Sequence, residues 1–295
     1  MSQHVRVGTR SSKLALAQTN RVISLLKDQS PNLKFEWVPI KTVGDQNPTV
    51  PLSEIGGKGV FISALEDALM AEKIDIAVHS LKDVTSQPMK GLSLVSFLKP
   101  ESCADAWVSE YTLKSVPAGS VVGTGSMRRK ALLKAIRPDI EVKEIRGNVD
   151  TRLRLLAEGN IDGLILSEAG LIRLGLSHHV KEALDLHEFV PAPGQGVIAI
   201  QVRTGDPRHV SLCESITDKA QTVLSQLELL FLETVSFNCE VPLGLHTQYD
   251  GLDILINVFL SNMSLSEEYR ETLRVPKAQA QAKMKQLAQM CLEKY

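Results

Sequence analysis

The sequence predicts an α/β protein, and three observations support that class. From Val5 to about Lys99, stretches with strand-like and helix-like spacing of apolar residues alternate, which is typical of βαβ units with a mostly parallel sheet. The alternation breaks near Lys99 and starts again at Ser120, which indicates a second α/β unit. Beyond Lys219 a helix, an antiparallel pair of strands and a last helix follow, which predicts a small α+β unit.

The first unit is predicted to follow the order strand, helix, strand, helix, strand. These elements are Val5–Gly8, a helix capped by Ser11 or Ser12, Phe35–Val43, a helix that includes Val60 to Leu69, and Ile74–Val78. The helix after Ser12 places Val22 and Leu26 on one face. This spacing predicts that the helix packs on the sheet.

The second and third units follow from the same patterns. Their predicted elements are strands at 120–123, 140–145 and 161–166, helices from Met127, from Val149 and over Leu171–Leu174, a strand pair joined by Tyr249–Gly251, and a last helix with Met284, Leu287 and Cys291 on one stripe. The strand Val197–Val202 has no helix and strand of its own, so we expect it to return to the first sheet. We therefore assign residues 1–99 and 197–217 to domain 1, 100–196 to domain 2 and 218–295 to domain 3.

Composition narrows the function classes. The chain has 295 residues and is 43% hydrophobic, which is enough for two or three domains with a sizeable core. Lys plus Arg number 33 against 34 Asp plus Glu, a formal net charge of -1, so no overall basic field would recruit nucleic acid or a membrane surface. Any anion binding is expected to be local.

The termini and cysteines favour a cytoplasmic protein. The segment Met1–Val7 lacks the apolar region of a signal peptide, and no apolar run is long enough to span a bilayer. The four cysteines lie far apart without a CxxC motif, which argues against a disulfide framework and a metal site. Cys213 and Cys291 fall on apolar stripes and are predicted to be core residues. Cys239 lies in a loop-like segment. The sequence there is compatible both with an exposed thiol that serves as an attachment point and with a buried structural thiol.

Lys82 and Asp83 follow the predicted strand that begins at Ile74. Ligands bind beyond the carboxyl ends of parallel strands, and an adjacent cation and carboxylate can hold an anionic substrate and stabilise a developing positive charge. On the pair alone, a solvated turn is the competing interpretation.

The segment Gly123–Ser126 follows a strand and opens a helix, so its backbone N–H groups suit an anion. A glycine-rich turn by itself is a weak signal, and this one matches neither a P-loop nor GxGxxG. Arginines recur at such strand-to-helix junctions: Arg10, Arg128, Arg129, Arg146, Arg152, Arg154 and Arg173. A single one is typical of a solvated surface, but the set favours recognition of carboxylates or phosphates.

Taken together, seven ordered segments resemble the porphobilinogen deaminase family, also called hydroxymethylbilane synthases. They are Val5–Gln18, Gly56–Phe61, Asp75–Asp83, Gly123–Arg129, Arg146–Leu153, Ala169–Gly175 and Pro191–Gly196. The resemblance covers nearly all of residues 5 to 203.

The resemblance implies two α/β domains like those of periplasmic binding proteins, around a cleft, plus the third domain. It also implies a covalent dipyrromethane cofactor, which is attached to Cys239 in a Cys-x-x-Pro-x-Gly segment. In the family, four porphobilinogens are deaminated and joined head to tail, and water then releases the linear tetrapyrrole hydroxymethylbilane. The implied protein is thus a transferase of porphyrin and haem biosynthesis, a monomer without a metal.

The resemblance also implies roles for individual residues. Asp83 would stabilise the cationic azafulvene left by ammonia loss, with Lys82 as its catalytic partner. The implied cofactor-binding residues are Cys239, Arg10, Ser12, Lys82, Asp83, Thr124, Ser126, Arg128, Arg129, Arg146, Gly147 and Arg152. The implied substrate-binding residues are Arg10, Ser12, Arg173 and Gln195.

The third domain departs from the family pattern. Phe237–Asn238 stand where the family commonly has two glycines before the cysteine, and Leu229 stands where an arginine is usual. A non-catalytic cytosolic anion-binding protein with a degenerate third domain is therefore the alternative function. A phosphate-handling enzyme is a further alternative, but no Walker lysine or cluster of metal-binding carboxylates supports it.

Overall fold

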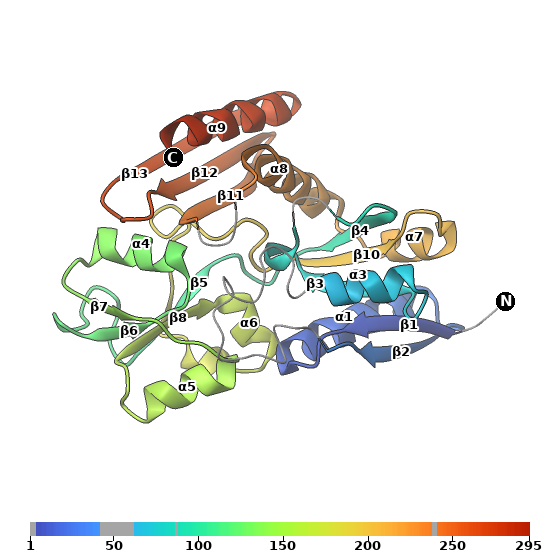
Figure 1. Ribbon diagram of the computed structural model, residues 1–295, viewed down its shortest axis with the longest axis horizontal. Coiled ribbons are helices and arrows are strands. Elements are labelled where there is room, and N and C mark those ends of the chain that lie inside the picture. The colour runs from blue at the N-terminus through green and yellow to red at the C-terminus, as the bar shows by residue number, and fades with distance from the viewer. Residues whose placement is uncertain (1–3, 42–61, 86–87, 238–240) are drawn as a thin grey trace. The chain divides into compact units, whose positions relative to one another are not determined.

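The computed structural model describes residues 4–41, 62–85, 88–237 and 241–295. Within these ranges the chain forms two compact units (Figure 1). Unit 1 comprises Met1–Pro100 and Val197–Val223, and unit 2 comprises Glu101–Gly196 and Leu224–Tyr295. The finer division into three domains stays a prediction.

Unit 1 is built on one five-stranded sheet, sheet A. Its strands are β1 (His4–Thr9), β2 (Lys34–Pro39), β3 (Ile76–Ser80), β4 (Leu92–Leu98) and β10 (Ile198–Arg203), in the spatial order β2-β1-β3-β10-β4. β1 pairs in parallel with β2 and β3, whereas β10 is antiparallel to both β3 and β4. Four strands therefore run one way and β10 runs against them. This confirms that the strand after residue 197 returns to the first sheet.

The helices of unit 1 cover both faces of sheet A because each carries an apolar stripe. α1 (Lys13–Gln29) begins where Ser12 Oγ accepts a hydrogen bond from Ala15 N, as its position before the apolar stripe predicts. α1 and α7 (Pro207–Glu214) share one core with sheet A, including Val22, Val78 and Cys213. α3 (Ser63–Met70) packs on the other face through Leu65 and Leu69.

Sheet B of unit 2 repeats this arrangement of strand directions. Its strands are β5 (Asp105–Val108), β6 (Val121–Gly123), β7 (Glu141–Lys143), β8 (Gly163–Ser167) and β9 (Glu182–Ala183), in the order β7-β6-β8-β5-β9. β6 pairs in parallel with β7 and β8, and β5 is antiparallel to β8 and β9. One strand again runs against four. Neither β5 nor β9 was expected from the sequence.

Helices cover sheet B on both faces. α4 (Met127–Ile136) packs with Trp107 and Ile165 in one core, and α5 (Val149–Ala157) and α6 (Glu168–Arg173) pack with Leu164 and Leu166 in another. Both cores follow the alternation of side chains along β5 and β8.

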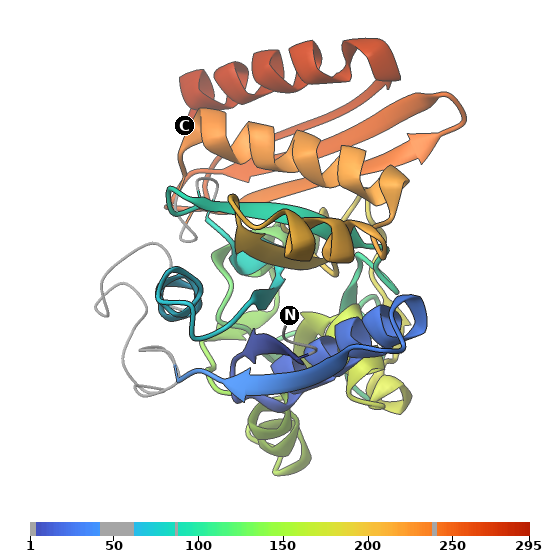
Figure 2. The ribbon, with the colours of Figure 1, turned by 90° about the vertical axis from the view of Figure 1, so that its right-hand side faces the viewer.

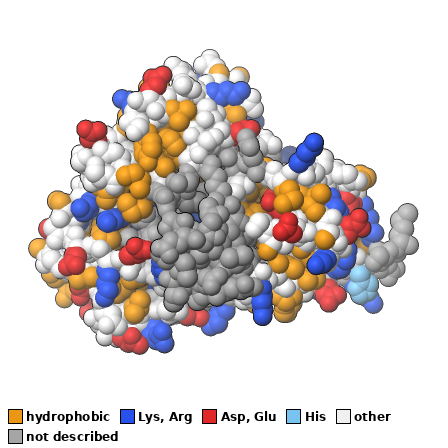
Figure 3. Space-filling model, in the orientation of Figure 1, with side chains coloured by type: hydrophobic (Ala, Val, Ile, Leu, Met, Phe, Trp, Pro, Cys, Tyr) orange, Lys and Arg blue, Asp and Glu red, His pale blue; other side chains and the backbone are white. Residues whose placement is uncertain are grey.

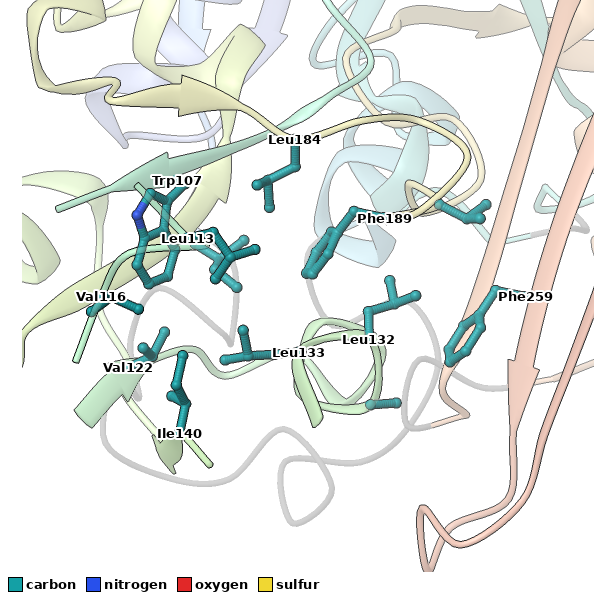
Figure 4. Close-up of a cluster of buried hydrophobic side chains, with 13 residues drawn as sticks. Trp107, Leu113, Val116, Val122, Leu132, Leu133, Ile140, Leu184, Phe189 and Phe259 are labelled. Atoms are coloured by element: carbon teal, nitrogen blue, oxygen red, sulfur yellow. The ribbon is translucent and has the colours of Figure 1, made fainter. Parts of the chain in front are cut away.

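Sheet C, also in unit 2, is antiparallel and has the order β11-β12-β13. Its strands are β11 (Leu243–Asp250), β12 (Asp253–Ser261) and β13 (Glu268–Pro276), and α8 (Lys219–Val235) and α9 (Ala280–Lys294) run alongside it (Figure 2). The predicted strand pair is confirmed, and β13 is a third strand that the sequence did not suggest. Phe259 of β12 reaches the core around Leu132 of α4 (Figure 4), which anchors sheet C within unit 2.

The surface agrees with the neutral charge balance. On the face shown in Figure 3, basic and acidic side chains are interspersed over the described residues instead of forming one patch of a single sign. No helix in the described ranges combines the length and apolar character that crossing a membrane requires.

Candidate active site

A cavity of about 240 Å³ lies in unit 1 at the carboxyl end of β3. Its lining residues come from the loop after β1, from α1, from Ile62 before α3 and from the end of β3: Arg10, Ser12, Leu14, Ala15, Gln18, Ile62, Val78, His79, Ser80, Lys82 and Asp83. The cavity therefore brings together four residues that the resemblance assigns to the site, namely Arg10, Ser12, Lys82 and Asp83.

A single 3-10 turn, Leu81–Asp83, places the two candidate catalytic side chains. Leu81 is buried and its N–H donates to Val197 O at 2.9 Å, while Val84 N donates to Leu81 O and closes the turn. Lys82 and Asp83 are both exposed. The turn is thus fixed by its first residue and presents a cation and a carboxylate to the cavity.

Arg10 and Ser12 flank the start of α1. Ser12 accepts from Ala15 N at 3.3 Å, so its hydroxyl proton remains available for a ligand. The first N–H groups of α1 and a nearby arginine make this side of the cavity favourable for a carboxylate.

Buried polar groups that were given no role from the sequence support the cavity. Gln18 on α1 exchanges hydrogen bonds with Ser80 at 2.9 and 3.2 Å. His79 bonds through Nε2 to Gln201 Oε1 at 3.0 Å. A polar residue on an apolar helix face, for Gln18, and inside an apolar strand, for His79, is the signal that could have drawn attention to them.

In unit 2 the turn between β6 and α4 opens a helix, as predicted, and hydrogen bonds from two of its backbone N–H groups to side chains hold it. Ser126 caps α4, and its Oγ accepts from Arg129 N at 3.4 Å. Ser126 N in turn donates to Thr124 Oγ1. A Cβ on Gly125 would lie 2.8 Å from Ile145 O, so only glycine fits this backbone approach.

Arg128 and Arg129 are buried and share one carboxylate. Asp105 accepts from Arg128 Nη1 at 2.7 Å and from Arg129 Nε at 2.9 Å, and the two arginines hold the pKa of Asp105 at about 2 against the effect of burial. Gln195 donates to Asp105 Oδ1 at 3.1 Å and accepts from Arg128 at 3.4 Å. Two cations therefore face one anion.

The surplus positive charge continues at Arg152. Its Nε donates to Gly147 O at 2.9 Å, which the left-handed Gly147 (φ +98°) presents. Burial, Arg129 and Arg146 lower the pKa of Arg152 to about 10. Arg152 pairs with no carboxylate in the described part of the chain. Arg146 donates to Glu144 at 2.8 Å, and its side chain is 37% exposed.

Arg173 is engaged within unit 2. Its guanidinium donates to Glu101 Oε2 at 2.6 and 3.0 Å and to the carbonyl oxygen of Gly196. The side chain is 6% exposed. Its expected role in substrate binding stays a prediction.

Cys239 and the segment Gly56–Phe61 lie outside the described residues. Burial raises the pKa values of Cys103, Cys213 and Cys291 to about 12, so these thiols stay protonated and are poor nucleophiles. Cys213 and Cys291 are buried, as predicted.

Phe237 is the bulky residue that stands two positions before Cys239. The left-handed position after α8 is Ser236 (φ +52°), and Phe237 lies outside the left-handed region. The Phe237 ring packs against that of Tyr295, with centroids 4.9 Å apart. Phe237 therefore does not adopt the left-handed backbone conformation that favours glycine.

Comparison with known proteins identifies the family. The profile described as "Porphobilinogen deaminase, dipyromethane cofactor binding domain" matches residues 5–211. The chain belongs to the porphobilinogen deaminase family. The porphobilinogen deaminase of Halalkalibacterium halodurans is 42% identical to it over 97% of this chain and 96% of its own length, and that of Syntrophomonas wolfei is 37% identical over 99% and 96%.

Among solved structures, the methionine binding protein MetQ superposes with a TM-score of 0.47 at 14% identity, covering 72% of this chain and 89% of its own. The assignment to the porphobilinogen deaminases rests on the sequence matches alone. Membership of this family favours an enzyme over a non-catalytic anion-binding protein.

Proposed function

We propose that this chain deaminates four porphobilinogen molecules, joins them head to tail and releases hydroxymethylbilane, with Asp83 as the carboxylate that enables ammonia loss. The observation that carries the assignment of roles is the cavity of unit 1, where Asp83, Lys82 and Arg10 line one space at the end of β3. Family membership indicates the reaction, and the geometry of the cavity supports the roles assigned to these residues.

Asp83 would stabilise positive charge on the substrate. When porphobilinogen loses ammonia, its methylene carbon and pyrrole nitrogen share a positive charge, and a fixed carboxylate lowers the energy of that cation. The new carbon–carbon bond then requires loss of a ring proton, which a carboxylate can accept. The exposed position of Asp83 on a short turn anchored by Leu81 suits both tasks.

Lys82, Arg10 and Ser12 would hold substrate carboxylates in the same cavity. Each porphobilinogen carries an acetate and a propionate, so every addition brings two further negative charges. A lysine, an arginine and the start of α1 supply complementary charge and donors without a metal ion.

The residues of unit 2 fit a polyanionic cofactor such as dipyrromethane. Arg128 Nε is buried without a hydrogen-bond partner among the described residues, and Arg129 and Arg146 both lower the pKa of Arg152, so this cluster gains stability when carboxylates bind. Thr124, Ser126, Arg128, Arg129, Arg146, Gly147 and Arg152 would hold the cofactor. When bound, dipyrromethane supplies the pyrrole carbon to which the first substrate is joined.

We also propose that Cys239 carries the cofactor, that Gln195 and Arg173 act toward the substrate, and that the chain works as a cytoplasmic monomer with three domains. The unpaired Cys103, Cys213 and Cys291 support a reducing compartment. Gln195 would act through Arg128, to which it is bonded.

Turnover of porphobilinogen by the purified protein and two variants tests the proposal. Asp83→Asn keeps the shape and removes the charge, so turnover should fall about 100-fold or more while the thermal midpoint is retained. Asp83→Glu should keep part of the activity. Asp67→Asn, an exposed carboxylate of α3, is the control and should behave as wild type. Unchanged turnover in Asp83→Asn would remove Asp83 from the mechanism.

A further inference from the structure

The imidazole of His79 lies in the cavity of Asp83 and has no role in the mechanism above. His79 is the fourth residue of β3, is 5% exposed and lines the cavity together with Arg10, Lys82 and Asp83. What this buried ring can contribute to ligand binding depends on which of its two nitrogens faces the ligand.

A chain of hydrogen bonds fixes the tautomer of this ring. Gln201 Nε2 donates to Glu66 Oε1 at 2.8 Å, and Met89 N donates to the same oxygen at 3.1 Å. The amide of Gln201 must therefore turn its oxygen toward His79, because the opposite orientation would set two acceptors against each other at Glu66. His79 Nε2 lies 3.0 Å from that oxygen and so carries the proton.

The other ring nitrogen, Nδ1, is then an unprotonated acceptor. It makes no hydrogen bond with any described residue. Because Nε2 is turned toward Gln201 and the ring lines the cavity, Nδ1 is the nitrogen that remains for a ligand there. Burial lowers the pKa of His79 to about 4, so the ring is neutral near pH 7.

We propose that His79 Nδ1 accepts a hydrogen bond from an N–H group of porphobilinogen bound beside Asp83, and that Gln201 and Glu66 are positioning residues that hold the required tautomer. This inference rests on the proposed function. Porphobilinogen offers its pyrrole N–H and its ammonium group, and both are donors that need an acceptor.

Neutrality of the ring matters as much as its orientation. An imidazolium at this place would add a positive charge next to the cation that forms on ammonia loss, and it would compete for the Asp83 carboxylate. A neutral acceptor orients the substrate and leaves the Asp83 charge for the developing cation. Gln201, held in turn by Glu66, fixes the tautomer of the ring, and burial keeps the ring neutral.

Two substitutions distinguish the contribution of the ligand-facing nitrogen, Nδ1, from that of the buried nitrogen, Nε2. In His79→Gln the amide nitrogen takes the place of Nε2 and keeps the bond to Gln201, but no acceptor replaces Nδ1. In His79→Asn the amide oxygen takes the place of Nδ1, and the bond to Gln201 is lost. His209→Gln, a buried histidine of α7 outside the cavity lining, is the control.

The inference predicts that His79→Gln keeps the thermal midpoint of the wild type but loses about tenfold in kcat/KM for porphobilinogen. His79→Asn should retain more of kcat/KM than His79→Gln although its thermal midpoint falls. A purely structural role predicts the reverse ranking, so a His79→Gln enzyme with wild-type kcat/KM overturns the inference. His209→Gln should leave kcat/KM unchanged.

Nitrogen NMR of the imidazole groups in the wild-type holoenzyme gives a readout independent of activity. With His79→Gln for assignment, the His79 ring should show a protonated Nε2 and an unprotonated Nδ1 at neutral pH. A proton on Nδ1 would overturn the inference. A wild-type protein that consumes no porphobilinogen would overturn the proposed function itself. Turnover by the wild type with an unchanged kcat/KM in His79→Gln would overturn only this inference.

Discussion

At the scale of single residues, Asp105 shows how the fold holds buried positive charge in place. One buried carboxylate holds two buried guanidinium groups in place, at 2.7 Å from Arg128 and 2.6 Å from Arg129. The arginines were predictable from their place after the glycine turn. Asp105 was not, because the four-residue strand that carries it gave no periodic signal in the sequence.

Replacing Asp105 by Asn should lower the free energy of unfolding by about 3–5 kcal/mol near neutral pH, since it leaves two buried cations without their counter-charge. The pKa of Asp105 lies below its ordinary value of 3.8, at about 2. Its stabilising contribution is therefore present above that ordinary value and is lost as the pH falls through about 2.

Urea unfolding of the wild type and Asp105→Asn checks this prediction, and the difference between them should shrink on acidification. Asp139→Asn removes a carboxylate that pairs with Arg137 on the surface and should have a much smaller effect. Equal effects of the two substitutions would contradict the account of Asp105.

Glu228 is a second buried carboxylate of unit 2, and it makes the stability of the protein depend on pH. It accepts from Gly194 N at 2.7 Å, from Thr247 N at 2.8 Å and from Thr247 Oγ1 at 2.9 Å. Burial nevertheless raises its pKa from 4.5 to about 7. The residue therefore ties α8 to the loop before β10 and to β11 while titrating near neutrality.

Because the folded-state pKa of Glu228 is raised, its stabilising contribution is complete below the ordinary value of 4.5 and is lost as the pH rises through about 7. The loss is on the order of 3 kcal/mol. Glu228→Gln cannot ionise, so its free energy of unfolding should depend less on pH between about 5 and 8 than that of the wild type. Urea unfolding over this range, with the exposed Glu233→Gln as control, measures the difference. Parallel pH curves for the wild type and Glu228→Gln would refute this assignment.

At the scale of elements, Gly125 connects a strand to a helix where no other residue fits. A methyl group there would lie 2.8 Å from Ile145 O, so Gly125→Ala should displace the turn and destabilise unit 2 by about 1–3 kcal/mol. Because the turn opens α4, cofactor loading should also fall.

Thermal denaturation and intact mass measure the two effects of Gly125→Ala. Gly205→Ala is the matched control, because a Cβ at Gly205 meets no atom within 4 Å. Gly205→Ala should match the wild type in both measurements. A fully loaded Gly125→Ala protein of wild-type stability would show that the turn tolerates a side chain.

Elements were predictable where apolar periodicity is strong. β1, α1 and the pair β11–β12 follow from it, and the isolated strand after residue 197 joins sheet A as expected. β9 has two residues and β5 has four, which is too short for a period to emerge. On β13, Tyr269, Leu273 and Val275 share the less exposed face, but Glu271 interrupts it, so the apolar alternation in the sequence is incomplete.

At the scale of the whole molecule, the sequence predicted the two α/β sheets and a smaller C-terminal unit but not how that unit is attached. Phe259 packs in the core of unit 2 with α4, and Leu245 N donates to Pro191 O at 2.9 Å. Contacts between residues so far apart in the chain leave no local pattern. The cavity of Asp83 was predictable because its residues fall in family motifs, whereas the partners of His79 and Gln18 depend on which helices and strands become neighbours.

The central claim is that this chain builds a tetrapyrrole on a dipyrromethane attached to Cys239. The intact mass of the purified protein tests it most directly, before and after brief exposure to porphobilinogen. The wild type should exceed its sequence mass by one dipyrromethane and then show further additions of single pyrrole units. Cys239→Ser should show neither, and Cys103→Ser, which alters a half-buried thiol of raised pKa, should match the wild type. A wild-type protein at its bare sequence mass that gains no pyrrole units, or an adduct that survives in Cys239→Ser, would contradict the account.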